Sequence, residues 1–62
     1  MNKTALMLAG MELAQCPEST EQMILDIVGK EMFEEGKPVD LSKVQEVTDL
    51  LLTGFRKARE GK

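Results

Sequence analysis

The chain has 62 residues, of which 42% are hydrophobic and 31% are charged, and it contains one cysteine and no histidine. A chain of this length forms at most one domain, and it buries only about 60% of the surface that its unfolded form exposes. One cysteine cannot form an internal disulfide, and without histidine no Ser, Thr or Cys nucleophile has the base that triad chemistry needs. Association with another chain is therefore the most available source of extra stability.

The net charge of −3 is unevenly distributed along the chain. Residues 10–50 contain ten of the eleven acids and carry a local charge of −7, whereas residues 51–62 carry a local charge of +3. Non-specific binding to duplex DNA requires several well-placed cations. An acidic body with a short basic end argues against that class of protein.

The first predicted element is a helix over residues 4–15. Its Ala, Leu and Met residues are strong helix formers, and Asn2 or Thr4 can cap its start. Apolar side chains occur nearly all round this helix, so we expect it to be buried on more than one side. At about twelve residues it is too short to cross a bilayer.

The tetrapeptide at positions 13–16, LAQC, is similar to the end of a bacterial lipoprotein signal. Glu12 places a charge inside the segment that should be apolar, and Gln15 is too large and polar for the position before the cysteine. The nearby Glu18 and Glu21 would oppose formation of a reactive thiolate. We therefore expect Cys16 to be an unmodified, partly buried side chain at a helix end. We also expect a cytoplasmic protein that makes no membrane contact.

The second predicted helix covers residues 20–35. Pro17 ends the preceding helix, and Ser19 is the predicted N-cap of this one. Gly29 is a candidate point of close packing against another helix, and Gly36 offers a left-handed stop. The apolar positions that follow helical spacing are Ile24, Ile27, Val28 and Met32, with Met23 and Leu25 beside them.

The third predicted helix covers residues 41–59, with Asp40 as its N-cap after the break at Pro38. Residues 60–62 are expected to fray. The apolar seam of this helix has spacings of three and four and consists of Leu41, Val44, Val47, Leu51, Phe55 and Ala58.

These elements predict a single all-α domain over residues 1–62, a small three-helix bundle that homodimerisation completes. The third helix carries more apolar side chains than so small a core can hold, which favours contact with a second copy or another protein. The predicted partner or dimer interface consists of Val47, Leu50, Leu51, Leu52 and Phe55. A basic rim of Arg56, Lys57 and Arg59 would set the orientation of the partner. The function that follows is helix-mediated protein interaction without catalysis.

A small helix-turn-helix regulator that binds DNA is the alternative. The second and third helices, joined by a turn with Gly36, would form the motif. The exposed residues early in the third helix would read the groove: Ser42, Lys43, Gln45 and Glu46. That set contains one cation and one repelling acid, which suits a groove-reading surface poorly.

The carboxylates near the end of the second helix are the one candidate metal cluster, and they are Glu31, Glu34, Glu35 and Asp40. The twelve-residue calcium-loop pattern is absent from the sequence, and solvated acids on a helix are common. The sequence therefore predicts no metal site, no catalytic residue and no cofactor.

Overall fold

The computed structural model describes residues 2–61, which form three helices and no strand. Helix α1 covers Lys3–Leu13, α2 covers Glu21–Met32, and α3 covers Leu41–Glu60. The all-α class and the three-helix bundle predicted from the sequence are confirmed.

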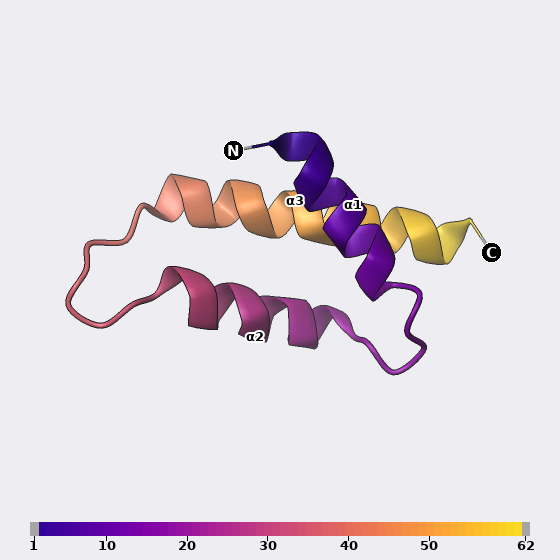
Figure 1. The fold of residues 1–62 in the computed structure, drawn as a ribbon, viewed down its shortest axis with the longest axis horizontal. Helices are drawn as coiled ribbons and strands as arrows, with labels where there is room; N and C mark the ends of the chain where they lie inside the picture. The colour runs from indigo at the N-terminus through magenta and orange to yellow at the C-terminus, as the bar shows by residue number, and fades with distance from the viewer. Residues whose placement is uncertain (1, 62) are drawn as a thin grey trace.

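Helix α3 is the element on which the other two pack (Figure 1). α2 runs antiparallel beside α3, and α1 crosses α3 obliquely, while within residues 2–61 α1 and α2 do not pack on each other. The molecule extends 41 × 22 × 13 Å and its radius of gyration is 12.0 Å, against about 10.6 Å expected for a compact domain of this length. The bundle is therefore flat and open on the side where α1 and α2 fail to meet.

Each helix begins at a side chain that accepts a hydrogen bond from the backbone three residues later. Asn2 Oδ1 accepts from Ala5 N–H at 3.2 Å, and Asp40 Oδ1 accepts from Lys43 N–H at 3.3 Å, as predicted. The predicted Ser19 cap is wrong, because Thr20 is the N-cap of α2 and its Oγ1 accepts from Met23 N–H at 3.3 Å.

The first two helices end earlier than the sequence predicted. α1 ends at Leu13, two residues early, and α2 ends at Met32, where Phe33 leaves helical geometry with φ −108° and ψ 74°. Gly36, with φ +82°, lies in the loop that follows and not at the end of the helix. α3 continues to Glu60, the first of the three residues that were predicted to fray. Gly61 is the C-cap of the helix, and Lys62 lies outside the described residues.

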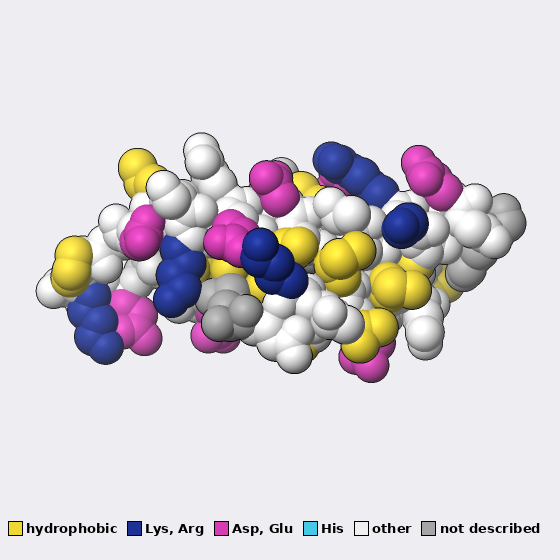
Figure 2. All heavy atoms as spheres, turned by 90° about the horizontal axis from the view of Figure 1, so that it is seen from above, with side chains coloured by type: hydrophobic (Ala, Val, Ile, Leu, Met, Phe, Trp, Pro, Cys, Tyr) yellow, Lys and Arg dark blue, Asp and Glu magenta, His cyan; other side chains and the backbone are white. Residues whose placement is uncertain are grey.

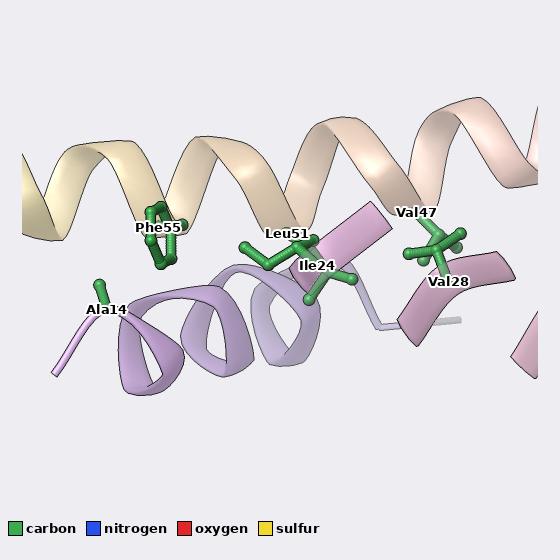
Figure 3. Close-up of a cluster of buried hydrophobic side chains, with 6 residues drawn as sticks. All are labelled: Ala14, Ile24, Val28, Val47, Leu51 and Phe55. Carbon is green, nitrogen blue, oxygen red and sulfur yellow. The ribbon is translucent and has the colours of Figure 1, made fainter. Parts of the chain in front are cut away.

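The core is a single cluster of six apolar side chains, which come from the residue after α1, from α2 and from α3: Ala14, Ile24, Val28, Val47, Leu51 and Phe55 (Figure 3). Along α3 this order matches the antiparallel course of α2, since Val47 lies by Val28 and Leu51 lies by Ile24. The predicted seam of α3 is confirmed except at Leu41, which is 66% exposed because the core begins one turn later, at Val44.

Two glycines set the distance between α1 and α3. A Cβ built on Gly10 would overlap the carbonyl oxygen of Leu51 and lie 3.0 Å from the backbone nitrogen of Phe55. A Cβ built on Gly54 would overlap the carbonyl oxygen of Met7. The backbones of the two helices therefore touch at Gly10 and Gly54. The predicted close packing at Gly29 is wrong, because the space beside that residue is open.

Candidate functional site

The predicted interface on α3 is largely used inside the chain. Val47 and Leu51 are 8% exposed and Phe55 is 4% exposed, so all three are core residues. Leu52 packs against this core from its edge, and Leu50 is half-buried. The surplus of apolar side chains on α3 is taken up by α1 and α2, which cover it from two directions.

The large exposed hydrophobic side chains instead lie mainly on α1 and α2. α1 carries two of them, Leu8 and Met11, and only Gly10 of this helix is buried. The expectation that α1 is buried on more than one side is wrong for the single chain, because only α3 covers it. Figure 2 shows hydrophobic side chains at the surface in the part of the view where α1 crosses α3. The other exposed positions are Met23, Leu25, Ile27, Phe33 and Leu41.

An apolar hollow of about 400 Å³ lies between α1 and α2, and we call it the α1–α2 groove. Ala9, Glu12 and Leu13 of α1 form one wall, Ile24 and Ile27 of α2 form the other, and Leu51 of α3 lies between them. The groove exists because α1 and α2 both pack on α3 while their own backbones stay apart. The sequence signal for it was the apolar character of α1 all round its circumference, which one partner helix cannot cover.

A second hollow, of about 480 Å³, lies beside the loop of residues 33–40 and has a mixed polar lining. The Nζ of Lys37 lies 2.9 Å from a carboxylate oxygen of Glu34 here, in an exposed ion pair. The described residues contain no group of three or more His, Cys, Asp or Glu side chains that could hold a metal ion. The predicted carboxylate cluster is thus spread over a helix end and a loop, without converging ligands.

Two members of the predicted basic rim are bound within the fold. Arg56 donates two hydrogen bonds to the carboxylate of Glu21, at 2.7 and 3.1 Å, and so ties α3 to the first turn of α2. This contact lowers the pKa of Glu21 below its ordinary value, chiefly through the hydrogen bond from Arg56. Lys57 is exposed and forms no ion pair within residues 2–61.

Arg59 holds the segment that follows α1. Its Nε donates to the carbonyl oxygen of Ala14 at 3.1 Å, and its Nη2 donates to the carbonyl oxygens of Cys16 at 2.8 Å and Ser19 at 2.9 Å. Its guanidinium lies 4.5 Å from the ring centroid of Phe55. Arg59 therefore fixes the turn between α1 and α2 against α3, a tertiary role that the position near a helix end did not reveal.

Cys16 is exposed, which corrects the expectation of a partly buried side chain. The pKa of its thiol is lowered from its ordinary value, first by a hydrogen bond from the backbone N–H of Glu18, then by the Ser19 hydroxyl, with a smaller contribution from the charge of Arg59. The expectation that Glu18 and Glu21 oppose formation of the thiolate is therefore wrong, because the net effect of the surroundings lowers the pKa. The chain contains no histidine that could act as a base for this thiol.

The geometry of α2 and α3 differs from that of a helix-turn-helix motif. That motif joins two steeply crossing helices by a turn of about three or four residues. Here α2 and α3 lie antiparallel side by side, and the loop of residues 33–40 separates them (Figure 1). Lys43 and Glu46 lie on the early turns of α3, where Glu46 pairs with Lys3 of α1 at 3.7 Å.

In the part of the chain from Asn2 to Gly61, no helix combines the length and the apolar character that crossing a membrane requires. Comparisons with protein-family models, with curated proteins and with solved structures found no match to this chain. Within the described residues, the α1–α2 groove and the exposed Leu8 and Met11 of α1 form the main candidate contact surface.

Proposed function

We propose that this chain is a non-enzymatic interaction protein that binds another macromolecule through helix-to-helix contacts at the α1–α2 groove. It would act by associating with, sequestering or modulating that macromolecule. The single observation that carries the proposal is the apolar groove of about 400 Å³ between two helices that both pack on α3 but whose backbones do not approach each other closely.

The composition of α1 supports this assignment. A helix that is apolar all round is normally buried on all sides. α1 is covered by α3 alone, along the side that contains Gly10, and Leu8 on the opposite side is 53% exposed. An apolar surface of this kind, bordered by polar residues, is typical of interaction sites on small proteins.

The groove also has the shape that helix recognition uses. An amphipathic helix binds by laying its apolar side into a hydrophobic groove, with anchors spaced three or four residues apart. Leu13 and Ile24 line the α1–α2 groove from opposite walls, and Leu51 lies at its base. The contact surface is thus assigned to α1 and α2, whereas the sequence had assigned it to α3.

Site-specific photo-crosslinking tests the proposal. Benzoylphenylalanine in place of Glu12 lies at the groove wall, and the same residue in place of Thr53 lies on the exposed side of α3 as a matched control. We expect irradiation in cell extract to give a discrete crosslinked species from position 12 and none from position 53. No crosslinked species from position 12, or equal crosslinking from both positions, contradicts the proposal.

A further inference from the structure

We infer that the occupant of the α1–α2 groove is a second copy of this chain, docked about a two-fold axis so that each copy covers the groove of the other. This inference rests on the proposed function, since it names the partner of the same surface. Three properties of the described residues carry it: the area left exposed, the self-complementary shape of the surface, and the charges beside the groove.

The first property is the area of surface that the single chain leaves exposed. The chain exposes 4713 Å² of accessible surface. A folded monomer of 6.9 kDa exposes about 4,000 Å². The excess of about 700 Å² is close to the area of about 800 Å² that each partner buries in a stable interface of standard size. One docked copy with an interface of standard size would therefore bring the exposed surface of the chain close to the value expected for a compact monomer of this mass.

The shape of the surface suits contact between two identical copies of the chain. A two-fold interface places the same patch of both copies in contact, so the patch must contain both a hollow and something that fills a hollow. The groove is the hollow, and α1 beside it is a ridge that carries the exposed Leu8. One copy can place the ridge of its α1 toward the groove of the other, and the symmetry repeats the contact.

The charges beside the groove are complementary under the same symmetry. Glu12 lies in the α1 wall, and Lys30 lies just outside the lining, about one helical turn after Ile27 of the α2 wall. Both side chains are exposed, and neither forms an ion pair within residues 2–61. In a two-fold dimer Glu12 of one copy faces Lys30 of the partner subunit, and the pair occurs twice.

Sedimentation equilibrium of the purified full chain, between about 5 and 500 μM, tests whether the groove is the dimer surface. Ile27→Glu adds a charge to the groove, and Leu25→Glu adds the same charge on the other side of α2. The two residues make a matched pair, with exposures of 44% and 43%. We expect a wild-type dimer, a dissociation constant at least tenfold higher for Ile27→Glu, and one within about twofold of the wild type for Leu25→Glu. A monomeric wild type, or a dimer more sensitive to Leu25→Glu, overturns the inference.

Charge reversal tests the two-fold arrangement. Glu12→Lys and Lys30→Glu each place like charges together across the interface, and each is expected to raise the dissociation constant about three- to tenfold. The double variant exchanges the two charges and should return the constant to within about twofold of the wild type. Additive weakening in the double variant would falsify the pairing. Circular dichroism of each variant establishes that the helices stay folded, as exposed helix positions allow.

The outcomes also separate this inference from the function on which it rests. A monomeric wild type that still gives a crosslinked species with a different protein from position 12 overturns the second copy and leaves the interaction function standing. A monomer that gives no crosslinked species from position 12 contradicts both. A dimer whose crosslink from position 12 has the mass of two chains supports both.

Discussion

Helix α3 meets its two neighbours in different ways. Toward α1 the contact is between backbones, because Gly10 and Gly54 bring the two helices together until neither tolerates a Cβ. Toward α2 the contact is between side chains, with Ile24 and Val28 in the core and the Arg56–Glu21 ion pair at one edge. The backbone contact with α1 leaves no space for a side chain at Gly10 or Gly54, whereas α2 leaves such space at Gly29. Close approach at one helix and looser packing at the other leave the groove between them.

Gly54→Ala should break the first contact and give the largest effect. The new methyl group overlaps the backbone of α1 at Met7, so the helices must separate or α1 must detach. Because the overlap is with backbone atoms, the cost should lie near the upper end of the range of about 1–3 kcal/mol for overpacking, and a gain of about 1 kcal/mol in helix propensity offsets part of it. We expect a net loss of about 2 kcal/mol in the free energy of unfolding, measured by urea denaturation at fixed protein concentration. A variant as stable as the wild type would contradict the close crossing.

Arg59→Ala should loosen the turn that holds the end of α1. The substitution removes the hydrogen bonds to the carbonyl oxygens of Ala14, Cys16 and Ser19, of which that of Cys16 keeps a second donor, the backbone N–H of Ser19. We expect a loss of about 1.5 kcal/mol in the free energy of unfolding, since hydrogen bonds from a charged donor contribute more than neutral ones. Arg59→Lys keeps the charge but not the fork of donors, and should recover less than half of the loss. Full recovery by lysine would show that charge alone matters here.

Thr20→Ala should weaken the start of α2 by about 1 kcal/mol, because Thr20 accepts the hydrogen bond from Met23 that caps this helix. Ser19→Ala is the comparison, and its effect should be smaller because Ser19 does not cap the helix and, within the described residues, its hydroxyl contacts only the exposed thiol of Cys16. Thermal unfolding followed by circular dichroism ranks the two variants. A larger loss of stability for Ser19→Ala than for Thr20→Ala would contradict the assignment of the N-cap to Thr20.

Gly29→Ala should stabilise the chain, in contrast to Gly54→Ala. The position lies in α2 with no atom within 4 Å of a new Cβ, so only the helix propensity changes. We expect a gain of about 0.5–1 kcal/mol in the free energy of unfolding by urea denaturation. A loss of stability would mean that α2 lies closer to a neighbour than the structure shows.

The Arg56–Glu21 pair should give the smallest effect, and one that depends on pH. The pKa of Glu21 is lowered in the folded state, mainly by the hydrogen bond from Arg56. The stabilisation is therefore fully present above the ordinary glutamate pKa of about 4.3 and is lost as the pH falls through the lowered value. The wild type should melt at a slightly higher temperature than Glu21→Gln at about pH 6, and the two melting temperatures should converge toward about pH 3. A difference that grows on acidification would contradict this sign.

The sequence was sufficient to predict the elements and most of the core. The breaks at Pro17 and Pro38 placed the two loops, the Asp40 cap placed the start of α3, and the spacing of Val47, Leu51 and Phe55 identified the buried side of α3. These are local signals, in which the residues that determine the structure lie within a few positions of it.

The groove was not predictable in the same way. Gly10, Gly29 and Gly54 look alike in the sequence, and only the crossing of two helices decides which of them touches another backbone. Arg59 near a helix end was consistent with a solvated cation, but it binds carbonyl oxygens about forty residues away in the sequence. A count of apolar residues indicated a surplus but not which helix would carry it, because that depends on how α1 and α2 divide the surface of α3.

A concentration series of two-dimensional NMR spectra of the wild-type chain tests the central claim most directly, because it reports every backbone amide at once. We expect the amide signals of Ala9, Glu12 and Ile27 to shift together as the concentration rises, while those of Leu25 and Thr53 stay in place. Shifts confined to the basic end of α3 would contradict the assignment of the contact surface to the α1–α2 groove, and no shift at any concentration at which the chain is soluble would contradict self-association through it.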